Sequence, residues 1–186
     1  MNHKRSAHLV FTAIAALISL TLINGCVTQS AALKAGEKAY YTKDYSTAYE
    51  QFRKAAGEEG NPEAQWWLSM MYAEGNGTAK DPAESLKWER LSAENGFATA
   101  QTGMGLRYMA GTGVEKDPRK AADWFKKAAD QGNGMALVSL AFMTARGQGV
   151  EKDPDKALKY FQDAKKRGHN VPEKYLTADG VAGIKP

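Results

Sequence analysis

The sequence predicts an all-α fold, a scaffold of stacked helix pairs, and two observations predict it. The chain repeats itself at an interval of 36 residues, with start and stop signals for helices in each repeat. Within the repeats, apolar residues recur at helical spacing on single stripes. The residues in register are Asp81-Pro82, Asp117-Pro118 and Asp153-Pro154; Gly60, Gly96, Gly132 and Gly168; and Gly75/Gly77, Gly111/Gly113 and Gly147/Gly149. Neither helix of a pair can bury its stripe alone, so the pairs must stack.

An export signal is expected before the helices, in residues 1–25. Lys4 and Arg5 give a positive start, and the segment from Leu9 to Ile23 is almost wholly apolar. This segment is about 15 residues long, whereas a helix that spans a bilayer needs roughly 20. Cleavage is therefore expected rather than an uncleaved membrane anchor, and it would leave Cys26, the only cysteine, at the start of the mature chain.

The residues Ile23-Asn24-Gly25-Cys26 resemble a bacterial lipobox. This resemblance implies that Cys26 carries acyl chains such as palmitate and anchors the protein in the cell envelope, with residues 26–30 as a lipidated tether. Val27, in place of an aspartate, resembles the pattern of outer-membrane lipoproteins that face the periplasm. The alternative is a free or paired cysteine after ordinary cleavage.

Composition excludes some classes of function. Hydrophobic residues make up 43% and charged residues 25% of the chain, which is ordinary for a globular protein. Without Lys4 and Arg5 the mature part has 23 basic and 21 acidic residues, a net charge of +2. This balance offers no basic surface for nucleic acid, so no nucleic-acid partner is expected.

The repeat domain is expected to cover residues 31–176. Residues 31–41 and the segment from Tyr45 to about Ala55 predict two short helices joined by a tight turn. From Asn61 onward each repeat predicts a helix, a glycine turn and a second helix, giving eight principal helices. Beyond Gly168 the pattern decays, and residues 177–186 are expected to form a frayed C-terminal tail.

Each repeat contains the residues that begin and end its helices. An aspartate at the N-cap accepts hydrogen bonds from the first-turn amides, and the proline that follows needs no amide proton there. The Gly-x-Gly pairs can adopt positive φ, which ends the preceding helix. In the second helices the predicted buried stripe consists of Ser85/Ala121/Ala157, Trp88/Trp124/Tyr160 and Ser92/Ala128/Ala164. In the first helices it consists of Ala64/Ala100/Ala136, Leu68/Met104/Leu140 and Tyr72/Tyr108/Thr144.

These repeats resemble the Sel1-like repeat, a relative of the tetratricopeptide repeat with a slightly longer period. The best copy contains Ala100, Met104, Gly105, Tyr108, Gly111, Gly113, Val114, Asp117, Ala121, Trp124, Ala128, Ala129 and Gly132. The copies that begin at Ala64 and Ala136 match well, and the segment from Ala31 to Gly60 is closer to a tetratricopeptide repeat. The resemblance implies a right-handed superhelix whose first helices line a concave surface, and a role as an adaptor for other proteins.

The mature chain lacks the residues for the common catalytic sites. It keeps one histidine, His169, and its one cysteine is expected to carry lipid. A zinc site or a Cys/His nucleophile is thereby excluded, and His169 lies at the degenerate end of the repeats, where a triad is not expected. The glycine pairs lack the lysine and hydroxyl residue of a phosphate-binding loop. Neither a cofactor nor a metal is expected.

If the first helices line a concave face, an unusually apolar set of side chains points into it. The candidate partner-binding residues are Tyr40, Tyr41, Trp66, Met70, Leu106, Met109, Val138, Phe142 and Arg146. Aromatic and methionine side chains suit an apolar partner because they dominate binding hot spots and adapt in shape. The alternative is that these residues pack between repeats.

The sequence therefore predicts a non-catalytic envelope lipoprotein that binds another protein or peptide through its concave face. One more specific alternative, drawn from the resemblance, is an immunity protein that neutralises a secreted antibacterial effector of the phospholipase type. A second is a hydrolase of cell wall or β-lactam, which the missing nucleophile–base pair disfavours.

Overall fold

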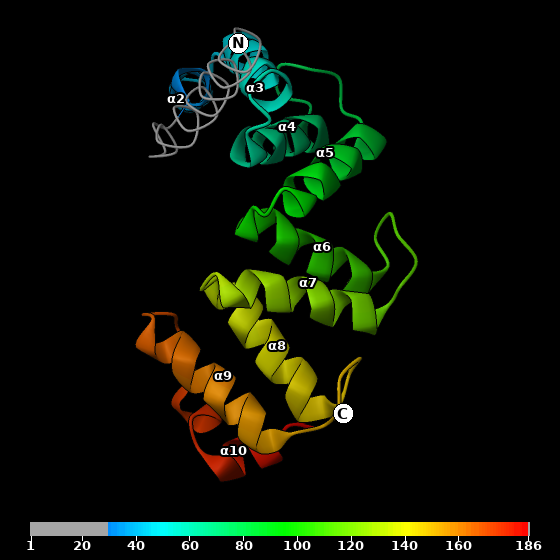
Figure 1. Ribbon diagram of the computed structural model, residues 1–186, viewed down its shortest axis with the longest axis vertical. Helices are drawn as coiled ribbons and strands as arrows, with labels where there is room; N and C mark the ends of the chain where they lie inside the picture. Colours follow the sequence, from blue (N-terminus) through cyan, green and yellow to red (C-terminus); the bar gives the residue numbers. More distant parts are fainter. Residues whose placement is uncertain (1–29, 186) are drawn as a thin grey trace, which may run out of the picture.

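The structure, a computed structural model, describes residues 30–185 as four stacked helix pairs and a short helical cap. The first helices of the pairs are α2 (Ala31–Tyr41), α4 (Pro62–Glu74), α6 (Ala98–Ala110) and α8 (Gly134–Arg146). The second helices are α3 (Tyr45–Gly57), α5 (Pro82–Glu94), α7 (Pro118–Asp130) and α9 (Pro154–Lys166). The pairs follow one another along the long axis of the molecule (Figure 1). The predicted all-α solenoid with eight principal helices is confirmed.

The helices begin and end at the predicted residues. Asp81, Asp117 and Asp153 cap α5, α7 and α9 through hydrogen bonds from first-turn amides, and a proline follows each cap. The bond from the Lys120 amide, followed by that from Arg119, lowers the pKa of Asp117. The Gly-x-Gly pairs have φ between 70° and 80°, where a side chain would strain the backbone.

Within the helix pairs, a small residue of the first helix lies against a buried phenyl ring of the second. A Cβ atom on Gly36 would come within 2.6 Å of the Phe52 ring, and one on Gly105 within 2.6 Å of the Phe125 ring. Both rings are almost completely buried. The absence of a side chain on these glycines therefore sets how closely the paired helices approach.

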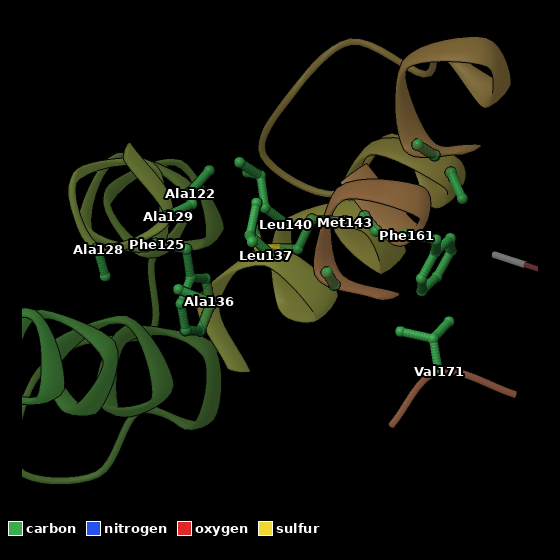
Figure 2. Packing of buried hydrophobic residues seen from close by; sticks show 14 of the residues in the cluster. Ala122, Phe125, Ala128, Ala129, Ala136, Leu137, Leu140, Met143, Phe161 and Val171 are labelled. Carbon is green, nitrogen blue, oxygen red and sulfur yellow. The ribbon is translucent and has the colours of Figure 1, made fainter. Parts of the chain in front are cut away.

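The buried aromatic stripe of the second helices lies one residue beyond the predicted position. Trp124 and Tyr160 are only half-buried, whereas Phe125 and Phe161, which follow them, are fully buried. Ala121 and Ala128 are buried as predicted. The buried residue between them on the same helix face is Phe125, four positions after Ala121. Figure 2 shows the resulting packing of α7, α8 and α9, which includes Phe125 and Phe161.

The fraying expected for residues 177–186 is not found in the described part of this segment, which ends at residue 185. After α9 the chain forms a 3₁₀ turn, η1 (Glu173–Tyr175), and a short helix, α10 (Ala178–Ala182). Val181 and Ile184 are buried against the last helix pair. The last pair has no following repeat to cover its apolar face, and these residues supply that cover.

The three junctions between consecutive pairs differ at equivalent positions. In the first, Trp67 of α4 stacks on Phe52 of α3, with ring centroids 5.2 Å apart. In the second, Glu89 of α5 takes the place of the phenyl ring. Its partner is Arg107 of α6, which stands where Met71 and Met143 are buried in the other repeats. The Glu89 and Arg107 side chains are 12% and 23% exposed, so this junction replaces a Phe–Met contact by a largely buried ion pair.

We expect Gly105→Ala to lower the free energy of unfolding by about 1–3 kcal/mol, because the new methyl group overlaps the Phe125 ring. Gly57→Ala is the matched control, since a Cβ atom there meets nothing within 4 Å. It should leave stability unchanged or raise it by up to about 1 kcal/mol. Urea unfolding followed by circular dichroism measures both, and equal effects of the two substitutions would contradict the close contact.

The ion pair is tested by restoring the residues of the other repeats. Arg107→Met alone leaves Glu89 largely buried and unpaired and should destabilise the chain by about 2 kcal/mol. The double variant Glu89→Phe/Arg107→Met should lie within about 1 kcal/mol of the wild type or above it, because a Phe–Met contact replaces the pair. Additive losses in the same unfolding measurement would show that the two residues are not equivalent to that apolar contact.

Candidate functional site

A pocket lies between α6 and α8, with Phe125 of α7 beneath it. We call it the α6–α8 pocket. Its volume is about 260 Å³. It is lined by Leu106, Met109, Phe125, Ser139, Phe142, Met143, Arg146 and Gln148. Apolar side chains dominate this lining, which is the usual character of a ligand-binding pocket.

The pocket exists because a bulky side chain is missing at the third junction. Ser139 of α8 occupies the repeat position that Trp67 occupies in α4. The Trp67 indole covers Phe52, whereas the small Ser139 leaves the space above Phe125 open. At the second junction the equivalent residue is Gly103, and there the Glu89 carboxylate lies over the backbone. Only the third junction combines a small residue with an apolar floor.

Helical spacing explains which residues meet. In α8, Ser139, Phe142, Met143 and Arg146 follow the spacing i, i+3, i+4 and i+7, which places them on one face. Of the predicted residues, Leu106, Met109, Phe142 and Arg146 are brought together here. Ser139 and Met143 were missed, although the same spacing could have identified them.

Other predicted residues lie outside this pocket. Trp66 of α4 is half-buried and packs against Trp67 and against Phe97, with centroids 5.0 and 5.8 Å away. Met70 and Val138 are also half-buried. Trp66 therefore contacts the next repeat through Phe97 and stays partly accessible.

Tyr40 and Tyr41 lie at the other end of the stack, in an aromatic cluster around Trp67. Their ring centroids are 4.9 and 6.1 Å from that of Trp67. Tyr41 is 74% exposed, and Tyr40 donates a hydrogen bond of 2.9 Å to Glu74 Oε2. Burial, and then this hydrogen bond, raise the pKa of Tyr40.

The acidic residues of the first helices, Glu37, Glu63 and Glu74, all lie in α2 and α4. Burial raises the pKa of Glu63 in α4, and the negative charge of Glu37 in α2 adds to the effect. α2 also carries Lys34 and Lys38, so this end of the stack has charges of both signs. Arg146 is the only charged residue that lines the α6–α8 pocket, and its guanidinium lies over the Phe142 ring, 5.5 Å from the centroid.

A hydrogen bond between the hydroxyl groups of Tyr49 and Tyr72, 2.8 Å long, joins α3 to α4. It raises the pKa of Tyr72 to about 12. The two rings also make an edge-to-face contact, with centroids 5.9 Å apart. This pair serves to connect consecutive repeats, since neither hydroxyl lies in the α6–α8 pocket.

The described part of the chain shows no arrangement that could hold a metal ion, because no three His, Cys, Asp or Glu side chains of residues 30–185 come together suitably. The imidazole of His169 lies against Gly134 at the start of α8. None of the helices within this range is long and apolar enough to cross a membrane. Cys26 and the tether lie outside the described residues, except for Ser30, which caps α2.

The fold defines a helical repeat protein, and an apolar pocket opens between its third and fourth helix pairs. A family model described as the Sel1 repeat matches three consecutive segments, residues 62–97, 98–133 and 134–169. The chain belongs to the Sel1 repeat family. Proteins of this family generally mediate protein–protein interactions, and their fold is typical of non-catalytic scaffolds. A comparison with curated proteins finds no significant relative.

Solved structures agree with this assignment. The Sel1 repeat protein from Oxalobacter formigenes is 38% identical over 71% of this chain, with a TM-score of 0.68. The protein c5321, a protective antigen of uropathogenic Escherichia coli, is 34% identical over 93% of this chain, with a TM-score of 0.64. This chain covers only 38% and 34% of those two proteins. Cysteine rich protein B of Helicobacter pylori, at 22% identity over 66% of this chain and 92% of its own, with a TM-score of 0.50, shares the fold.

Proposed function

We propose that this chain is a non-catalytic envelope lipoprotein that binds another protein or peptide through the face formed by its first helices. The observation that carries the proposal is the α6–α8 pocket, whose apolar lining is open to solvent. Leu106, on its wall, is 46% exposed. A large exposed apolar side chain beside a pocket is typical of a protein-binding surface.

The repeats support this assignment of the face. Met70, Leu106 and Phe142 occupy the same position in three consecutive first helices. None of the three is fully buried, yet all are large and apolar. Packing between repeats requires burial, whereas contact with a partner requires that the side chains stay accessible. The position therefore fits partner binding better than core packing.

The envelope location rests on the sequence of residues 1–26. The proposed anchor is the lipid on Cys26, with the repeat domain facing the periplasm from the outer membrane. Several acyl chains would hold it firmly, since each buried CH₂ contributes about 0.8 kcal/mol.

The binding face is tested by recovering partners from detergent-solubilised envelope with the full-length chain and identifying them by mass spectrometry. Leu106→Ala removes a wall of the pocket, and Ser139→Trp fills it as Trp67 fills the first junction. Both substitutions should weaken the binding of a specific partner at least about fivefold. Because Leu106 is 46% exposed, its loss should change the free energy of unfolding by only about 0.5 kcal/mol.

Leu91→Ala is the matched control, since Leu91 is a 37% exposed leucine on α5, away from the pocket. It should retain the partner. The proposed face would be wrong if the partner survives both pocket substitutions, or if Leu91→Ala removes it equally.

The lipid anchor is tested by labelling cells with palmitate. The wild-type chain should incorporate the label and fractionate with membranes, whereas Cys26→Ser should do neither, because the thiol that carries the lipid is gone. Asn24→Ala keeps the cysteine and should remain labelled. Label retained by Cys26→Ser, or a wild-type chain recovered without membrane, would contradict the anchor.

A further inference from the structure

We infer that the α6–α8 pocket receives a large apolar side chain from a segment of a partner protein, and that Arg146 pairs with an aspartate or glutamate one or two residues away in that segment. This inference rests on the proposed binding function and specifies the chemistry of the partner. It follows from the volume of the pocket, the charge at its rim and the origin of the space.

The size of the pocket selects a single side chain. Its volume is about 260 Å³, below the range of roughly 300–1,000 Å³ that accommodates drug-sized ligands. The pocket also occupies the position that the indole of Trp67 fills in another repeat of the same chain. A partner side chain in the pocket would lie over Phe125 much as Trp67 lies over Phe52.

The charge at the rim selects the neighbouring residue. Arg146 is exposed and takes part in none of the ion pairs formed within residues 30–185. No carboxylate lines the pocket to neutralise it. Its contact with the Phe142 ring holds the guanidinium beside the opening. Arginine binds carboxylates with paired hydrogen bonds, and the apolar surroundings strengthen such an interaction.

The repeat pattern indicates that the positive charge is a local feature. Arg146 is equivalent to Ala110 in α6 and to Glu74 in α4. The structural repeat thus requires no arginine at this position, and the neighbouring first helices carry a small residue or a negative charge there. Among α4, α6 and α8, only the C-terminal end of α8 combines a positive charge at this position with an open apolar pocket.

The tether of this chain is a poor occupant. It joins the stack at Ser30, before α2, whereas the pocket lies between the third and fourth helix pairs. Residues 27–29, Val-Thr-Gln, contain no acidic side chain to pair with Arg146. A segment of another protein satisfies both requirements.

The test uses a library of random nonapeptides that are displayed within a carrier protein. The library is selected for binding to the full-length chain in detergent. Enriched sequences should contain a large apolar residue with Asp or Glu within two positions. The best sequence, synthesised with an amidated C-terminus and a fluorescent label, should bind about tenfold more weakly to Arg146→Ala. Arg146→Glu should prefer the same peptide with its acidic residue changed to lysine.

Arg119→Glu is the matched control, because it makes the same change of charge at an exposed site on α7 and should leave peptide affinity unchanged. Enrichment of apolar peptides without acidic residues, or equal affinity for Arg146→Ala and the wild type, would overturn the inference. In that case, loss of binding in Ser139→Trp and Leu106→Ala would still support the proposed face. Enriched peptides that bind all these variants equally would overturn both.

Discussion

The close approach of a small residue to a buried phenyl ring is the constraint on which the structure depends. Gly36 against Phe52 and Gly105 against Phe125 leave no room for a Cβ atom, and these contacts fix the distance between paired helices. In the last pair Ala141 and Phe161 hold the equivalent positions, and both are fully buried. A small residue and a buried phenyl ring thus recur in three of the four pairs. The exception is the second pair, where Ser69 and Glu89 stand in place of the small residue and the ring.

The junctions between the pairs differ from one another, and the α6–α8 pocket arises from one of these differences. The first junction is filled by Trp67, the second holds the ion pair of Glu89 and Arg107, and the third is left open by Ser139. A third apolar cluster, formed by Ala93, Ala100 and Met104, lies at the same junction, and Trp66 and Tyr108, which pack against it, also pack against the N-terminal and C-terminal clusters. A largely buried ion pair contributes little net stability compared with an apolar contact. The second junction thus combines buried apolar contacts with a largely buried ion pair.

Most of the fold could be predicted from the sequence because it depends on local signals. The Asp-Pro caps and glycine turns place the helix ends without reference to the rest of the chain. The aromatic register was misplaced by one residue, since Trp124 and Phe125 are adjacent and only the neighbouring helix decides which of them is buried. The pocket was harder to predict because it arises from a missing side chain. Leu106, Met109, Phe142 and Arg146 were identified from their face, whereas Ser139, which creates the space, has no chemistry of its own to indicate it.

The 3₁₀ turn that follows α9 supports the wall of the pocket. Tyr175 of η1 stacks on Phe161, with centroids 5.3 Å apart, and both rings meet Phe142 edge-to-face at 5.2 and 5.0 Å. Aromatic pairs of this geometry are each worth about 0.5–1.5 kcal/mol beyond their burial. Phe142 is therefore held from behind while its other side faces the pocket and Arg146. A partner side chain that enters the pocket meets a wall that is already ordered, which lowers the entropy lost on binding. The helical cap thus links the stability of the last repeat to the shape of the proposed binding site.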